Sequence, residues 1–326
     1  MKRLVLVVGV GRSGTSLLAG VLGQLGFHIP QPEVTADDTN PRGFGEPRWV
    51  VDFHTKLMRR LRVIVFDARP VAFEKTAAVA SEAEPAQELR DWLTGELAEA
   101  GDVVVKDPRV GWFLDLWRRA CDELQAQTSQ ITMLRHPSEI LTSARRSYGT
   151  WQSDASRAAA WLNVMLETER ATRGARRVYI RYEDLLADWR AQITRAGQAL
   201  DLPLLADIAP ERAAAVDAFV DPSLHRSRIG WEGLEVPASV RELCDEVWSL
   251  FERLAAGEDV GAQLDDALGR YRVLYGEAEA IAQPSVTAVR SRKVAGPAAR
   301  PPTLRMKVTR RVPKPVRARL RRLAGR

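Results

Sequence analysis

The chain has 326 residues, of which 45% are hydrophobic and 28% charged, so its composition is that of an ordinary soluble globular protein and excludes global disorder. This length suits two average domains or one large α/β domain. The two cysteines form no CxxC pair, which excludes a disulfide framework and indicates a reducing compartment. No apolar run approaches the ~20 residues of a membrane span, so we expect a soluble, cytoplasmic protein.

The net charge of +6 is unevenly distributed along the chain. Residues 280–326 hold 14 of the 48 Lys and Arg residues and no Asp or Glu, which leaves 34 basic against 42 acidic residues elsewhere. A body that binds nucleic acid is more usually basic itself. We therefore expect no nucleic-acid partner, and the basic tail is a separate question.

The hydrophobic pattern predicts strands that alternate with helices. Residues 4–8 form a short apolar run typical of a buried strand, and residues 15–25 have helical spacing and end at Gly26, a suitable C-terminal cap. Residues 30–48, rich in Pro, Asp, Asn and Gly, indicate a long loop. The pattern then predicts strands over 103–105, 131–134 and 178–180, and helices over 49–61, 82–100, 110–124, 137–148, 155–173 and 184–200.

This alternation predicts an α/β fold, with a parallel β-sheet flanked by helices on both faces. Residues 210–275 have an all-helical pattern and are expected to pack on the sheet. From Glu277 onward Pro, Ala and Arg dominate. We therefore divide the chain into a domain over residues 1–276 and a basic, flexible tail over residues 277–326.

A glycine-rich turn, GVGRSGTS over residues 9–16, separates the first predicted strand from the first predicted helix. Such a turn aims backbone N–H groups and a helix N-terminus at one point, and so creates an anion-binding site. The phosphate-binding P-loop pattern fits at Gly9, Gly14 and Ser16, but Thr15 occupies its lysine position. This departure disfavours a small-molecule or nucleoside kinase, which we keep as the alternative function.

The pattern RSGTS after a first strand resembles the 5′-phosphosulfate loop of the sulfotransferases that use 3′-phosphoadenosine 5′-phosphosulfate. In that family a Lys or Arg occupies the position of Arg12, and hydroxyl residues follow the glycine. A second segment, RHPSEILTS over residues 135–143, lies where a predicted strand runs into a helix. Arg135 and Ser143 have the spacing of the Arg and Ser that bind the donor's 3′-phosphate in this family, and the resemblance covers about residues 4–230.

The resemblance implies transfer of a sulfuryl group from this donor, without a metal, to a hydroxyl or amine of a carbohydrate, glycolipid or small-metabolite acceptor. By family position, Arg12 would stabilise charge on the leaving oxygen. Thr15, Ser16 and the N–H groups of the loop would hold the 5′-phosphate. The donor-binding residues that the resemblance implies are Gly11, Arg12, Ser13, Gly14, Thr15, Ser16, Arg135, Ser143, Arg226 and Arg228.

Two carboxylates are candidates for the catalytic base. Glu46 lies in the loop after the first βα unit, where family members with a glutamate base place it, and Asp107 lies at the end of the second strand, near the position of the family's histidine base. The carboxyl ends of parallel strands line the ligand crevice, so both carboxylates can reach it. The non-catalytic alternatives are a helix N-terminal acid for Glu46 and an ion pair with Arg109 or Arg12 for Asp107. We favour Glu46, and Lys106 would add a positive charge near the transferring group.

Two further groups of residues complete the sequence-based expectations. His28, His54, His136 and His225 are too scattered for a metal site, so we expect structural roles for them and no bound metal. The spacing of the apolar residues over 316–323, among arginines, predicts a short basic helix in peripheral contact with an anionic membrane. A disordered polycationic end is the alternative.

Overall fold

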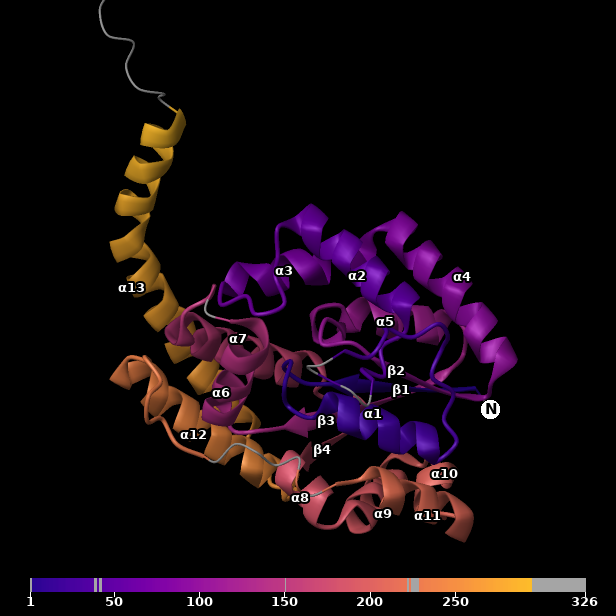
Figure 1. Cartoon of the computed structure of the whole chain (residues 1–326). Helices are drawn as coiled ribbons and strands as arrows, with labels where there is room; N and C mark the ends of the chain where they lie inside the picture. The colour runs from indigo at the N-terminus through magenta and orange to yellow at the C-terminus, as the bar shows by residue number, and fades with distance from the viewer. Residues whose placement is uncertain are drawn as a thin grey trace, which may run out of the picture. The chain divides into compact units, whose positions relative to one another are not determined.

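Four parallel strands form the central sheet of the computed structural model, which describes residues 2–37, 40, 43–149, 151–221, 223 and 229–294 (Figure 1). They are β1 (Arg3–Val8), β2 (Asp102–Lys106), β3 (Gln127–Leu134) and β4 (Arg177–Arg181), in the order β2-β1-β3-β4. Each strand is parallel to its neighbours. Because the chain moves to one side of β1 for β2 and to the other side for β3, the sheet has its topological switch point between β1 and β3, where such sheets bind ligands.

Helices pack on both faces of this sheet (Figure 1). The helices are α1 (Thr15–Gln24), α2 (Arg48–Leu61), α3 (Pro70–Ala78), α4 (Ala83–Glu99), α5 (Leu114–Glu123), α6 (Pro137–Tyr148), α7 (Asp154–Ala171), α8 (Tyr182–Ala187), α9 (Trp189–Leu200), α10 (Pro203–Ala206), α11 (Pro210–Phe219), α12 (Ala238–Ala255) and α13 (Gly261–Val294). Short 3-10 helices occur at Val79–Ser81 and Val110–Trp112.

Successive residues of β1 point into two different cores. Leu4, Leu6 and Val8 pack with residues of α2, α4, α5, α7 and α12, whereas Val5 and Val7 pack with residues of α1, α8, α9 and α11. All five side chains are at most 2% exposed. A strand covered on both faces is apolar throughout rather than alternating, which explains the sequence of this run. The predicted fold class, a parallel sheet between two helical layers, is confirmed.

The predicted helices agree with the observed ones except at three places and at the short α10, which was not predicted. The expected helix over 110–124 is divided, with a 3-10 turn at Val110–Trp112 before α5. The expected helix over 184–200 is interrupted at Asp188, whose carboxylate accepts a hydrogen bond from the N–H of Ala191 and begins α9. Helix α3 was not predicted. The end of α1 agrees with expectation, because Gly26 has a φ of +100° and continues the turn past the helix.

The contacts within the chain define two units, Met1–Tyr275 and Gly276–Arg326. Helix α13 continues to Val294, so helical structure extends beyond Glu277, where the composition changes. In the part of the chain that the structure describes, no helix has both the length and the apolar character needed to cross a membrane. The segment 316–323 lies outside the described residues, and its contact with a membrane stays a prediction.

Candidate functional site

The glycine-rich turn after β1 ends at the N-terminus of α1. Gly9 and Gly14 have φ values of +145° and +98°, and a Cβ at Gly14 would lie 2.3 Å from the ring of Tyr182. Arg12 has a φ of +75°, in the left-handed region that a non-glycine residue seldom adopts. No described side chain caps α1. The first N–H groups of the helix therefore remain for an anion at this turn.

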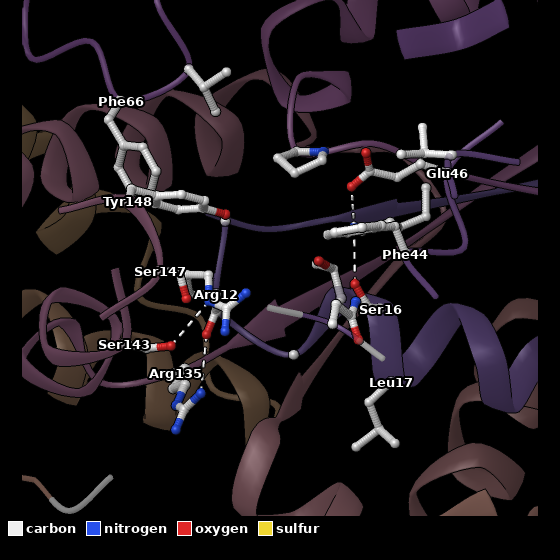
Figure 2. A pocket seen from close by; sticks show the side chains of 18 of the residues that line it. Arg12, Ser16, Leu17, Phe44, Glu46, Phe66, Arg135, Ser143, Ser147 and Tyr148 are labelled. Carbon is white, nitrogen blue, oxygen red and sulfur yellow. Dashed lines mark hydrogen bonds and ion pairs between the residues drawn. The ribbon is translucent and has the colours of Figure 1, made fainter. Parts of the chain in front are cut away.

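A cavity of about 770 Å³ adjoins this turn (Figure 2). Its described lining contains six cationic side chains and a single carboxylate: Arg12, Lys106, Arg109, Arg135, Arg146, Arg157 and Glu46. A volume in the range of ~300–1,000 Å³ is typical of small-molecule sites. An excess of positive charge in a concave site raises the local concentration of anions. The cavity is therefore suited to a ligand that carries several negative charges.

Arg135 and Ser143, predicted as a pair, both lie on this cavity and both contact Arg12. The Nε of Arg12 donates a hydrogen bond of 3.0 Å to the Oγ of Ser143, and Nη1 of Arg135 donates one of 3.1 Å to the carbonyl oxygen of Arg12 (Figure 2). The guanidinium of Arg135 lies 4.4 Å from the ring centroid of Tyr182, and its Nε is 3.5 Å from a carboxylate oxygen of Glu139. These contacts fix two guanidinium groups beside one another at one side of the cavity.

Glu46 lies at the other side of this view (Figure 2) and forms a buried ion pair with Lys106. The ammonium group of Lys106 donates to the carboxylate of Glu46, and at 3.1 Å to the Oγ of Ser16. Burial raises the pKa of Glu46 above its usual value of 4.5, and the charge of Lys106 limits that rise. A carboxylate with a raised pKa, on the wall of a cavity, is chemically suited to accept a proton from a bound molecule.

Asp107 is not among the described residues that line the cavity. One of its oxygens accepts a hydrogen bond of 2.7 Å from Nδ1 of His54, and the other accepts bonds from the backbone N–H and Nη1 of Arg109. The indole N–H of Trp117 donates to Nε2 of His54 at 3.0 Å, so the proton of this imidazole is on Nδ1. Burial opposes the ionisation of Asp107, but His54 and Arg109 outweigh it and lower the pKa of the carboxyl. The ion pair with Arg109, the non-catalytic alternative for Asp107, is present.

The remaining donor-binding residues predicted from the sequence fall into three groups. Those that line the cavity are Gly11, Arg12, Gly14, Thr15, Ser16, Arg135 and Ser143. Ser13 is 1% exposed, and its Oγ has no hydrogen-bond partner among the described residues. Arg226 and Arg228 lie outside the described residues, so the structure says nothing of them.

Part of the cavity wall was not predicted from the sequence. It comes from the loop before α3 and from the junction between α6 and α7, and it includes Phe66, Tyr148, Trp151 and Arg157. None of these residues belongs to a recognisable motif. The only signal for this part of the wall was Arg157 itself, because it is a charged residue near the start of α7, and that helix is buried for most of its length.

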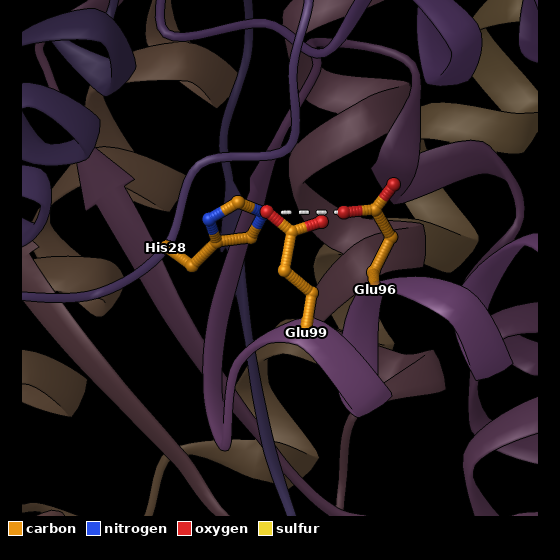
Figure 3. A group of neighbouring side chains, drawn as sticks. All are labelled: His28, Glu96 and Glu99. Carbon is orange, nitrogen blue, oxygen red and sulfur yellow. Dashed lines mark hydrogen bonds and ion pairs between the residues drawn. The ribbon is translucent and has the colours of Figure 1, made fainter.

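A second group of titratable side chains lies at α4. The ligand atoms of His28, Glu96 and Glu99 all lie within 4.8 Å of one another, although the histidines appeared scattered in the sequence (Figure 3). An imidazole and two carboxylates are chemically suitable ligands for a divalent cation. The hydrogen bond of 3.2 Å between His28 Nε2 and Glu96 accounts for the proximity of two of them, and Glu99 is exposed. We assign this group no function.

Comparisons with known proteins agree with the resemblance seen in the sequence. A family model described as "Sulfotransferase family" matches residues 5–207, which is more than half of the chain. Similar solved structures include the sulfotransferase domain of the Synechococcus PCC 7002 olefin synthase (20% identity, TM-score 0.42, covering 77% of this chain and 96% of that one). They also include the sulfotransferase domain from the curacin biosynthetic pathway (17%, TM-score 0.44, 76% and 98%) and sulfotransferase STF1 of Mycobacterium tuberculosis H37Rv (18%, TM-score 0.41, 74% and 76%).

The comparison with curated proteins found no match. The family model spans all four strands of the sheet and the glycine-rich turn, together with α6 and α7. It therefore covers every residue named above as lining the cavity. On the match of this model, the chain belongs to the sulfotransferase family.

Proposed function

We propose that this protein transfers a sulfuryl group from 3′-phosphoadenosine 5′-phosphosulfate to a hydroxyl or amine of a carbohydrate, glycolipid or small metabolite. The observation that carries the proposal is the convergence of Arg12, Arg135 and Ser143 beside the uncapped N-terminus of α1. The donor has two separate anionic ends, and we assign each end to a different group of residues on this side of the cavity. The turn and α1 would hold the 5′-phosphosulfate, and Arg135 with Ser143 would hold the 3′-phosphate.

The hydrogen bond from Arg12 to Ser143 is compatible with binding of a phosphate at Ser143. A serine hydroxyl accepts hydrogen bonds and also donates one. The Oγ of Ser143 already accepts from the Nε of Arg12, so its own proton remains available for a phosphate oxygen. Arg135 uses Nη1 for the carbonyl oxygen of Arg12, and its other guanidinium nitrogen at the fork is available to the same phosphate. Both residues can therefore contact the anion without a change in their existing bonds.

The reaction would be an in-line displacement at sulfur. The acceptor oxygen or nitrogen forms a bond to sulfur, the bond from sulfur to the bridging phosphate oxygen breaks, and 3′,5′-adenosine bisphosphate leaves with the electron pair. The proton of the acceptor passes to Glu46, and Arg12 stabilises the charge that develops on the leaving oxygen. When Glu46 takes up this proton, the charge of Lys106 is no longer neutralised by its partner. Lys106 then adds to the stabilisation of the negative charge that remains in the cavity.

A kinase activity is the alternative, and two observations disfavour it. Thr15 occupies the position where a P-loop kinase has the lysine that contacts the β- and γ-phosphates. The Mg²⁺ ion of such an enzyme is bound through one or two carboxylates. Of the described residues that line the cavity, Glu46 alone carries a carboxylate, and Lys106 neutralises it. The cavity is thus better suited to a metal-independent transfer.

Calorimetric titration with 3′,5′-adenosine bisphosphate, with 5′-AMP and with Mg·ATP tests the proposal. An arginine contact to a phosphate and a serine hydrogen bond together contribute ~3–4 kcal/mol, or several hundredfold in affinity. The bisphosphate is therefore expected to bind several hundredfold more tightly than 5′-AMP, without a metal, and Arg135→Ala should remove most of this difference.

Arg145→Ala is the matched control, because Arg145 lies on α6, the helix that follows Arg135, but outside the cavity lining, where it donates to the carbonyl oxygen of Gly233. This variant should bind the bisphosphate as the unmodified protein does. Equal affinities for the bisphosphate and 5′-AMP, or a preference for Mg·ATP, would contradict the proposed function.

A further inference from the structure

Arg157 is a buried cation on the cavity wall that the proposed donor site does not use. Its side chain is 1% exposed, and its Nη2 donates a hydrogen bond of 2.6 Å to the carbonyl oxygen of Gly149. Its Nη1 is also buried and has no hydrogen-bond partner among the described residues. Arg157 forms no ion pair with any described carboxylate, although it lines the same cavity as Arg12 and Lys106.

Three other cations of the cavity, Lys106, Arg109 and Arg135, have acidic partners nearby. Lys106 pairs with Glu46, and Arg109 pairs with Asp107. A guanidinium that is buried without a counter-charge loses its hydration and gains no Coulomb energy in return. Nearly all buried polar groups in native proteins have a partner, so an orphaned one needs an explanation. An oxyanion of a bound molecule would supply the partner that Arg157 lacks.

The surroundings of Arg157 include aromatic side chains that also adjoin the donor site, since the ring centroid of Tyr148 lies 6.0 Å from the guanidinium carbon of Arg12. Gln152, which lines the same cavity, donates to the carbonyl oxygen of Phe66 at 2.8 Å, and its own Oε1 is buried with no hydrogen-bond partner among the described residues. In Figure 2, Phe66 and Tyr148 lie on the other side of Arg12 from Arg135. Trp151, which is 68% exposed, also lines the cavity. Aromatic side chains therefore accompany the buried cation.

We propose that Arg157 binds an oxyanion of the acceptor, a carboxylate or a phosphate, and that the aromatic side chains contact the acceptor's apolar body. This inference rests on the proposed function, since it assigns both anionic ends of the donor to other residues. It specifies the acceptor class as a hydroxyl or amine compound that also carries a negative charge. Arg157 is then a specificity-determining residue, because it contacts a part of the acceptor that does not react.

The test is a calorimetric titration of the protein saturated with 3′,5′-adenosine bisphosphate. The probes are three phenols that differ in charge, 4-hydroxyphenylacetate, its neutral amide and tyramine, together with phenyl phosphate. A hydrogen bond to a charged group corresponds to about tenfold or more in affinity. The carboxylate, the phosphate or both should therefore bind at least about tenfold more tightly than the amide, and tyramine most weakly. The anion that binds more tightly, the carboxylate or the phosphate, identifies the oxyanion that Arg157 binds.

Arg157→Gln should remove this preference for anions, because glutamine can still donate to the carbonyl oxygen of Gly149 but carries no charge. Arg157→Lys, which keeps the charge, should retain part of it. Arg145→Gln is the control, since Arg145 lies outside the cavity lining and the substitution should leave the preference unchanged. If Arg157→Gln does not fold, the comparison of probes on the unmodified protein and on Arg157→Lys still decides the question.

The outcomes separate this inference from the proposed function. Failure of the bisphosphate to bind counts against the proposed function itself. If the bisphosphate binds, an absence of anion preference, or an absence of binding by both anions, overturns the inference on Arg157 alone. A preference that survives in Arg157→Gln overturns it as well. Loss of bisphosphate affinity in Arg157→Gln, equal to the loss of anion affinity, would assign Arg157 to the donor site instead.

Discussion

The Nε of Arg12 donates a hydrogen bond of 3.0 Å to the Oγ of Ser143, across 131 residues of sequence. This bond joins the glycine-rich turn after β1 to the second half of α6, which follows β3. In the proposed reaction the two residues contact opposite ends of the donor. The bond therefore holds the side chain that stabilises the leaving oxygen in a fixed relation to the residue that binds the 3′-phosphate.

Arg12→Ala is expected to lower kcat by ~10²-fold or more, with a milder effect on the affinity for 3′,5′-adenosine bisphosphate, since the charge on the leaving oxygen is largest in the transition state. Steady-state kinetics and calorimetry measure the two effects. Arg12→Gly is a useful companion, because glycine adopts the φ of +75° without strain. Equal losses in both variants assign the effect to the guanidinium. Near-normal turnover in Arg12→Ala would contradict the proposed role.

Glu46→Gln keeps the shape of the side chain and removes its ability to accept a proton. We expect a loss of ~10²–10⁴-fold in rate with the bisphosphate still bound. The melting temperature should also fall, because the buried ammonium of Lys106 loses its counter-charge. Asp107→Asn should instead act mainly on stability, because His54 and Arg109 occupy both of its oxygens. A large loss of rate in a well-folded Asp107→Asn, together with an active Glu46→Gln, would show that the base is Asp107.

The pH dependence of the rate gives a separate test of Glu46. A general base must be ionised to act, so the rate should rise as the pH increases through the pKa of Glu46. Burial raises this pKa above 4.5, and the acidic limb of the pH–rate profile is therefore expected above that value. The residual activity of Glu46→Gln should lack this limb, whereas Lys106→Met, which removes the opposing charge, should move it to higher pH. An unchanged limb in Glu46→Gln would assign it to another group.

Residues in local motifs were predictable from the sequence, because the geometry of a strand followed by a turn and a helix is set over a few residues. Arg12, Arg135 and Ser143 belong to such motifs, and they lie together on the cavity. The division of the expected helix over 184–200 was less predictable. Asp188 carries an N-cap signal, but the apolar spacing continues on both sides of it, and only the packing distinguishes one helix from two.

The direction of Asp107 was not predictable from its place at the end of β2. Successive side chains of an extended chain point to opposite sides. Lys106 points to the cavity, so the next residue, Asp107, points away from it and meets His54 of α2. The rule that ligands bind at the carboxyl ends of parallel strands applies equally to Lys106 and Asp107, and it does not say which of the two side chains faces the ligand. Arg157 was missed for a different reason, since its burial depends on contacts between segments distant in the sequence.

Asp107→Asn is expected to lower the free energy of unfolding by ~1–3 kcal/mol at neutral pH, because a neutral amide replaces the buried carboxylate that accepts hydrogen bonds from His54 and Arg109. The carboxyl has a pKa below its ordinary value of 3.8 in the folded protein. Its contribution is therefore fully present well above pH 3.8 and is lost as the pH falls through the lowered pKa. Urea unfolding of both proteins between pH 3 and pH 7 should show a difference in the free energy of unfolding that is constant near neutrality and smaller toward the acidic end.

Asp115→Asn is the control, because it breaks only an exposed ion pair with Arg118 and should lower the free energy of unfolding by ~0–1 kcal/mol. An Asp107→Asn variant no less stable than Asp115→Asn would show that Asp107 does not hold α2, through His54, against the end of β2.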